Sequence, residues 1–158
     1  MSDRTARQRW MGILARTPFA DLERVRAGLA ARGALPEYES LRGPEIGLAM
    51  VRGRAGGDGQ RFNLGEMTVT RCSLRVRSGD SGAGDLIGHA YIAGREKRRA
   101  ELAALFDALL QDDRRHDDLE RVLIGPAEAA LRARRQVTEA AVGRSKVDFF
   151  TMVRGETA

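Results

Sequence analysis

Cysteine, tryptophan, histidine and long apolar runs are all scarce in this chain of 158 residues. The single cysteine, Cys72, excludes an internal disulfide and a cysteine-based zinc site. The longest strictly apolar stretches, such as 48–51 and 103–106, are far shorter than the roughly 20 residues that cross a membrane. Residues 1–10 are charged and lack the apolar run of about 7–15 residues that marks a secretory signal. These absences predict a soluble, cytoplasmic protein without a membrane segment.

The sequence also lacks the short motifs that mark nucleotide-binding and hydrolytic sites. Neither glycine-rich segment, 53–59 or 78–85, continues into the Lys-Ser/Thr pair of a phosphate-binding loop or completes a dinucleotide-binding turn. Residues 79–84 resemble a nucleophile elbow, but the last glycine is replaced and a strand pattern follows instead of a helix. His89 and His116 lack metal-binding spacing, and we interpret each as structural or solvated. We therefore predict no self-contained active site, no metal site and no cofactor bound by this chain.

Arginine is abundant and makes the chain basic. Of 27 cationic residues 25 are arginine, and against 22 acidic residues they give a net charge of +5 and an isoelectric point near 10.3. This balance permits nucleic acid, phosphorylated metabolites or acidic proteins as partners. A small basic nucleic-acid-binding module is therefore one alternative. The interspersed acids, an aromatic content of 5% and the lack of a recognisable RNA- or DNA-binding motif weigh against it.

Two helical patterns open the chain. The first covers residues 4–15, where the apolar side chains form one stripe. Thr17 is placed to cap a second helix and Pro18 to occupy its first position, where a missing N–H costs nothing. Apolar residues follow at spacings of three and four as far as Leu29, and Gly33 can end the helix in a left-handed conformation.

The middle of the chain changes to the periodicity of strands. Residues 37–42 and 44–53 have an extended pattern, and residues 68–77 alternate strictly, with Thr70, Cys72, Leu74 and Val76 on one face. Residues 86–93 are predicted as a further strand. Because the connections between these strands resemble loops rather than helices, a mostly antiparallel sheet is expected.

Helical periodicity returns after residue 95. An apolar stripe over residues 102–110 predicts a core-facing helix, residues 112–118 form a charged break, and an alanine-rich helix runs from Gly125-Pro126 to about Gly143. Residues 147–155 are apolar and prone to extended structure. The chain is thus predicted as a single α+β domain over residues 1–158, with N-terminal helices, a central mostly antiparallel sheet, C-terminal helices and a terminal extended segment.

A group of cations lies where the apolar helix should begin. Arg95, Lys97, Arg98 and Arg99 oppose the helix dipole there, and together with free N–H groups they could contact an anion. A solvated face tempered by nearby glutamates is the alternative interpretation.

The two ends of the chain carry large apolar residues that could contact a partner. Phe149, Phe150 and Met152 lie within ten residues of the C-terminus, where chains usually fray. They dock either into the sheet of this chain or onto a partner. Trp10 is a further candidate for a partner interface, with burial in the core as its default interpretation.

Four stretches of sequence are distinctive: RQRWMGIL (7–14), GEMTVTRCSLRV (65–76), GHAYIAGREKRRAELAALFDAL (88–109) and RSKVDFFTMVRG (144–155). Together, and in this order, they resemble the G subunit of the bacterial carbon–phosphorus lyase core complex. The resemblance runs from about residue 7 to the C-terminus, and the last stretch is the most specific.

This resemblance implies an accessory subunit that sits with the H, I and J subunits in a symmetric core complex. With the I subunit, members of the family support attack of a phosphonate on the anomeric carbon of ATP, which is a substrate of the complex. Adenine leaves, and a ribose 1-phosphonate 5-triphosphate is formed. The resemblance places the catalytic residues on the I subunit and the iron–sulfur and S-adenosylmethionine chemistry on the J subunit.

Overall fold

The computed structural model describes residues 5–54, 59–77 and 84–144. In chain order its elements are α1 (Ala6–Leu14), α2 (Phe19–Ala31), β1 (Tyr38–Arg54), β2 (Arg61–Val76), β3 (Leu86–Ala93), α3 (Lys97–Leu109), α4 (Asp113–Leu119), the π-helical turn η2 (Glu120–Ile124) and α5 (Gly125–Arg144). The predicted α+β class is therefore confirmed. The predicted extended tail at 147–155 lies outside the described residues, and the assignment of 1–158 to a single domain stays a prediction.

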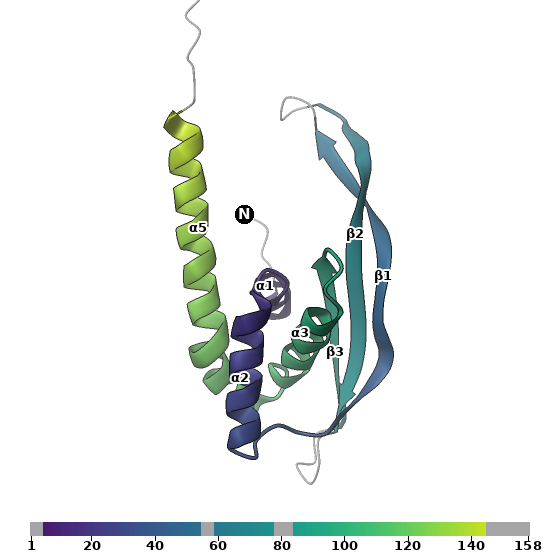
Figure 1. The fold of residues 1–158 in the computed structure, drawn as a ribbon, viewed down its shortest axis with the longest axis vertical. Helices are drawn as coiled ribbons and strands as arrows, with labels where there is room; N and C mark the ends of the chain where they lie inside the picture. Colours follow the sequence, from purple (N-terminus) through teal and green to yellow (C-terminus); the bar gives the residue numbers. More distant parts are fainter. Residues whose placement is uncertain (1–4, 55–58, 78–83, 145–158) are drawn as a thin grey trace, which may run out of the picture.

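The three strands form an antiparallel meander in the order β1-β2-β3, as the loop-like connections predicted. Helix α3 packs on one face of this sheet, which we call the inner face (Figure 1). Helices α1 and α2 pack against α3, and α5 stands on the side of the helices remote from the sheet. The core thus lies between the sheet and the helical layer.

The inner face carries the side chains that the alternation predicted. Thr70, Cys72, Leu74 and Val76 of β2 are all buried, which confirms the strand pattern of residues 68–77. On β3, Gly88 permits the close approach of α3, because a Cβ at this position would lie 1.9 Å from the carbonyl oxygen of Ala104.

Helix α3 is buried on more sides than the apolar stripe predicted over residues 102–110 would require. The predicted residues, Leu102, Leu105, Phe106, Leu109 and Leu110, are all buried, and so are Ala100, Ala103, Ala104, Asp107 and Ala108. The helix is enclosed because the sheet covers one side and α1 and α2 cover the other.

The start of the second helix differs from the prediction. The Thr17 hydroxyl does not cap α2; it donates a hydrogen bond of 2.9 Å to the carbonyl of Ile13 in α1, and Pro18 is the N-cap residue. The predicted end is confirmed: Gly33 has φ +64°, and its N–H and that of Ala34 donate to carbonyls of the last helical turn.

The charged segment 112–118 was predicted as a break between helices, and this prediction was wrong. The segment forms α4, which begins because the Asp112 carboxylate accepts a hydrogen bond of 3.1 Å from the N–H of Arg114. Leu119 at its end is buried and anchors the short helix to the core. Among the described residues, none of the helices combines the length and hydropathy that a membrane crossing requires.

Candidate functional site

The four cations predicted as an anion contact do not point to one place. Arg99 donates to the carbonyl of Ala15 at the end of α1 (2.7 Å) and pairs with Glu96 (2.8 Å), and its side chain is only 15% exposed. It therefore joins α3 to α1. The guanidinium of Arg98 lies 5.1 Å from the centroid of the Phe19 ring in α2.

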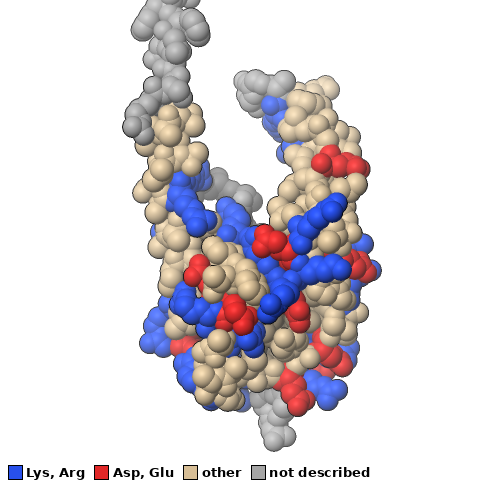
Figure 2. All heavy atoms as spheres, in the orientation of Figure 1, with Lys and Arg blue, Asp and Glu red and all other residues tan. Residues whose placement is uncertain are grey.

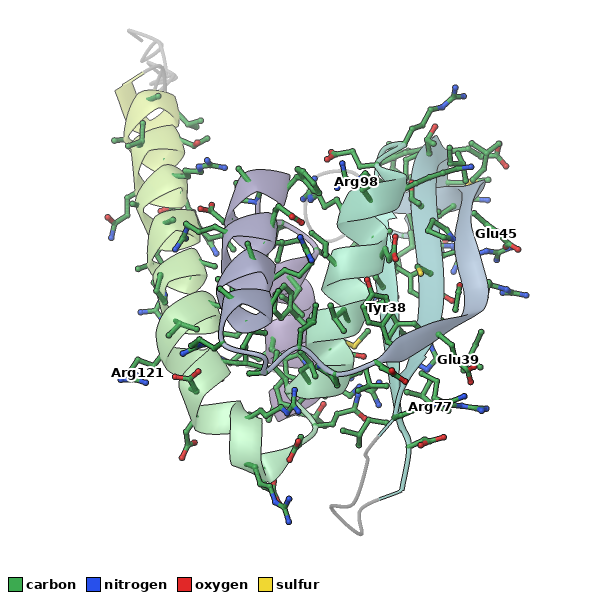
Figure 3. The ribbon with its side chains drawn as sticks, turned by 60° about the horizontal axis from the view of Figure 1, so that its bottom comes forward. Tyr38, Glu39, Glu45, Arg77, Arg98 and Arg121 are labelled. Carbon is green, nitrogen blue, oxygen red and sulfur yellow. The ribbon has the colours of Figure 1, made fainter. Side chains whose placement is uncertain are left out.

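Arg95 and Lys97 remain exposed, without an ion pair to any described residue. They lie at the foot of the β1–β2 hairpin, since the N–H of Gly94 donates to the carbonyl of Thr68 (2.8 Å). An anion contact by these two residues stays a prediction. Figure 3 shows Arg98 at this end of α3.

Beyond this point β1 and β2 project as a hairpin arm, defined here as residues 46–54 and 61–68. Strand β3 ends at Ala93, opposite Val69, which also pairs with Gly47 of β1, so from Leu48 onward the arm has no third strand. A helix of 13 residues is about 20 Å long, whereas a strand of 17 residues spans about 56 Å. Helix α3 is therefore too short to cover the whole of β1, and the arm rises clear of the helices (Figure 1).

The arm carries exposed apolar side chains on both faces. On its inner face Ile46, Leu48 and Met50 are 43%, 64% and 51% exposed. On its outer face Phe62 and Met67 are 47% and 39% exposed. The arm is thus apolar on both sides and largely in contact with solvent.

A β-bulge shapes the arm near its middle. Leu64 has no partner in the register, which passes from Val51 opposite Gly65 to Arg52 opposite Asn63. Gly65 adopts φ +148°, a conformation that favours glycine. The bulge turns Leu64 across Gly53, so that its side chain, 61% exposed, joins the apolar outer face.

Lower on the sheet, the outer face is lined by ion pairs instead. Arg75 pairs with Glu39 (3.1 Å) and Arg71 with Glu45 (3.2 Å). Figure 3 labels the two glutamates on β1. At least fourteen of the 25 arginines form such pairs with carboxylates. On the side of the molecule seen in Figure 2, red and blue side chains likewise lie next to one another over the lower half. Because so many arginines are paired with carboxylates, this arrangement does not support the nucleic-acid-binding alternative.

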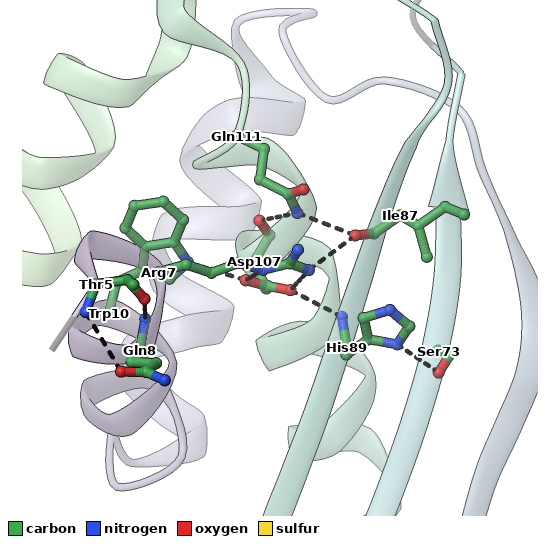
Figure 4. Close-up of polar contacts among 9 residues, drawn as sticks. All are labelled: Thr5, Arg7, Gln8, Trp10, Ser73, Ile87, His89, Asp107 and Gln111. Atoms are coloured by element: carbon green, nitrogen blue, oxygen red, sulfur yellow. Dashed lines mark hydrogen bonds and ion pairs between the residues drawn. The ribbon is translucent and has the colours of Figure 1, made fainter.

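A buried carboxylate joins three elements in the core. Asp107 of α3, fully buried, accepts hydrogen bonds from the Arg7 guanidinium (2.8 and 3.2 Å), the Trp10 indole N–H (2.9 Å) and the backbone N–H of His89 (2.9 Å) (Figure 4). Trp10 is therefore a core residue that holds α1 to α3, rather than a surface residue of this chain. Sequence reasoning missed this centre, although one signal was available: a lone aspartate inside the apolar stretch LAALFDALL.

A second charged cluster holds α1 to the C-terminal helices. Arg9 pairs with Glu120 (2.5 Å) and with Glu128 (2.8 Å). Hydrogen bonding to Glu128, and then to Glu120, raises the pKa of Arg9, and the same bond from Arg9 lowers the pKa of Glu128. Both side chains thus remain charged near neutral pH and serve a structural contact.

Other reactive side chains, in the core and on the outer face of the sheet, are similarly engaged. Burial, and secondarily the charge of Glu101, raises the pKa of the Cys72 thiol to about 11, so that it is protonated and unreactive at neutral pH. His116 Nδ1 lies 2.8 Å from the carbonyl of Leu110. Ser73 Oγ and His89 Nδ1 are 2.8 Å apart, as a cross-strand pair of β2 and β3.

Several small pockets lie on the surface of the described residues. Four surface pockets have volumes of about 170 to 300 Å³, at or below the lower end of about 300–1,000 Å³ for small-molecule sites. The smallest lies between the start of α2 and α5, and Arg16, Arg24 and Arg134 surround its apolar floor. Within the part of the chain that the structure describes, no three His, Cys, Asp or Glu residues are grouped to hold a metal ion.

Comparison with known proteins agrees with the resemblance. Residues 5–155 match the family described as phosphonate metabolism protein PhnG. A protein of Rhizobium meliloti (strain 1021), the alpha-D-ribose 1-methylphosphonate 5-triphosphate synthase subunit PhnG, is 43% identical over 152 residues, which cover 95% of this chain and 90% of that protein. The chain therefore belongs to the phosphonate metabolism protein PhnG family.

Proposed function

We propose that this chain is an accessory subunit of an α-D-ribose 1-methylphosphonate 5-triphosphate synthase in organic phosphonate catabolism. The observation that carries the proposal is the 43% identity, over 95% of the chain, to a protein named as a subunit of that synthase. The chain then contributes to an enzyme without turning over substrate by itself.

The reaction of the complex is a transfer onto ribose. An oxygen of a phosphonate such as methylphosphonate forms a bond to C1′ of ATP, the bond from C1′ to the adenine nitrogen breaks, and adenine leaves with the electron pair and takes up a proton. The product keeps the triphosphate on C5′. ATP is in this proposal a substrate of the whole complex, and this chain holds no cofactor of its own.

The way this chain uses its reactive side chains supports an accessory role. Asp107, the one buried carboxylate of α3, is saturated by the donors that fix α1 to the core. The Cys72 thiol is protonated at neutral pH. These groups serve packing, which is consistent with a chain whose contribution is assembly.

The proposed partners are the H, I and J subunits of the carbon–phosphorus lyase core complex, and the I subunit is the most direct one. Phe149, Phe150 and Met152, predicted at a partner interface, lie outside the described residues, and their contact stays a prediction.

Adenine release tests the proposal. The purified chain, the other core subunits without it, and the full set are each incubated with ATP and methylphosphonate, and adenine is measured by chromatography. We expect release only from the full set. Substantial turnover by this chain alone, or an undiminished rate without it, would contradict the accessory role.

A further inference from the structure

More than half of the exposed large apolar side chains of the described residues lie on the hairpin arm. Among the described residues eleven large hydrophobic side chains are exposed, and six of them lie on the arm: Ile46, Leu48, Met50, Phe62, Leu64 and Met67. A two-stranded ribbon is only marginally stable in water by itself, and contiguous apolar patches of this kind mark interaction surfaces.

The distribution of these residues over both faces restricts how a partner can bind. A partner that lies flat against the arm would cover one apolar face and leave the other in water. Covering both faces requires a groove with two walls. We propose that the arm inserts into a groove of another subunit of the complex, with apolar walls and carboxylates at its rim; this inference rests on the proposed function.

The charges of the arm indicate what lies at that rim. Arg52, Arg54 and Arg61 lie at its far end, whereas Glu66 is the single acidic residue among its described positions. Arg54 and Arg61 have no ion pair to any described residue, and Arg52 hydrogen-bonds to the neutral Asn63. Carboxylates on the partner would match this end of the arm.

The same charges disfavour a second copy of this chain as the partner. The space-filling view shows an open hollow between the arm and α5 (Figure 2), and the inner face of the arm forms one of its sides. The arm of a second copy entering there would carry its three arginines toward the exposed Arg95 and Lys97 at the foot of the inner face. Glu96, which lies between them, is already paired with Arg99, so like charges would meet and we take the occupant to be a different protein.

Assembly of the complex with two paired variants tests the insertion. Leu48→Ser with Met50→Ser alters the inner face, and Phe62→Ser with Met67→Ser alters the outer face. Val137→Ser on α5, where the side chain is 71% exposed, is the matched control. We expect each arm pair to weaken assembly at least about tenfold and the control to leave it unchanged, since buried apolar anchors dominate such interfaces.

The charges are tested separately. Arg54→Glu with Arg61→Glu should weaken assembly most at low ionic strength, because salt screens charged pairs. Arg121→Glu, near the start of α5 and far from the arm, is the control (Figure 3). Hydrogen exchange of the wild-type complex should show protection of the arm amides that the free chain lacks, which tests the contact without any variant.

The outcomes separate this inference from the proposed function. A wild-type chain that does not assemble with the other subunits overturns the proposed function and the insertion together. Normal assembly of both arm pairs, loss in only one of them, or equal loss in the Val137 control overturns the insertion alone. A dimer of the isolated chain that the arm variants dissolve would assign the arm to a second copy instead.

Discussion

Replacing Asp107 by alanine is expected to lower the free energy of unfolding by about 4 kcal/mol. The carboxylate is fully buried and accepts hydrogen bonds from the Trp10 indole and from the His89 backbone, in addition to its ion pair with Arg7. In the variant both of these N–H groups remain buried without an acceptor, at about 1–3 kcal/mol each. The Arg7 side chain is 38% exposed and can turn to water, so it adds little.

This loss is large relative to the stability of a domain of this size, usually about 5–15 kcal/mol. For a chain of this length it corresponds to a fall in melting temperature of about 8–16 °C. Trp10 is the only tryptophan, so its fluorescence reports unfolding from the centre of the contact. Urea titrations followed by this signal, with circular dichroism as the second probe, give the free energies.

The control removes an exposed pair of the same chemistry. Arg135 and Glu139 pair at 2.6 Å on α5, with side chains 81% and 60% exposed. Arg135→Ala should leave the free energy of unfolding nearly unchanged, because solvent screens an exposed ion pair. A loss below about 1 kcal/mol for Asp107→Ala would refute the reasoning, because it would show that the two donors find other acceptors.

Three further predictions concern packing, reactivity and pH. Gly88→Ala should prevent folding or severely destabilise the chain, because the added Cβ would overlap the backbone of α3. Gly28→Ala, whose added Cβ would have no atom within 4 Å, should instead stabilise α2 by about 0.5–1 kcal/mol. Thermal melting of the two variants and the wild type measures both effects. Cys72, with a pKa of about 11, should react with a thiol reagent at pH 8 much more slowly in the native chain than in urea, and equal rates would contradict its burial. Because Arg9 lowers the pKa of Glu128 in the folded state, this carboxylate stabilises the fold above its ordinary pKa near 4.5 and loses that contribution as the pH falls through the lowered value. Glu128→Gln should therefore reduce stability at pH 7 and leave it nearly unchanged in strong acid, as measured by urea midpoints.

Much of the fold follows from periodicity because packing here obeys local patterns. The alternation at 68–77 placed Thr70 and Cys72 on the buried face, and the strand predicted at 86–93 has the observed bounds of β3. The apolar stripe of 102–110 identified the central helix. In each of these segments one face meets one neighbouring layer, so the sequence period and the burial agree.

The sequence-based predictions failed where a residue can form either of two local hydrogen bonds or structures, or where two contacting residues are far apart in the sequence. A threonine can cap the helix that follows or donate to the one that precedes, and Thr17 does the latter. The charges of 112–118 suggested a solvated break, yet an N-cap and one buried leucine suffice for a short helix. Asp107 meets Arg7 across 100 positions, and no local pattern encodes that pairing.

The arm shows most clearly what periodicity leaves undetermined. Leu48 and Met50 alternate as Cys72 and Leu74 do, and both pairs lie on the inner face of the sheet. The second pair is buried and the first is exposed only because α3, about 20 Å long, ends its cover before β1 ends. The difference in length between the helix and the strand thus decides which residues of the same alternating pattern are buried and which are exposed. An apolar alternation that extends past its covering helix is evidence that the missing cover belongs to another chain, and here it marks the inner face of the arm as one of the two faces that the proposed partner groove would cover.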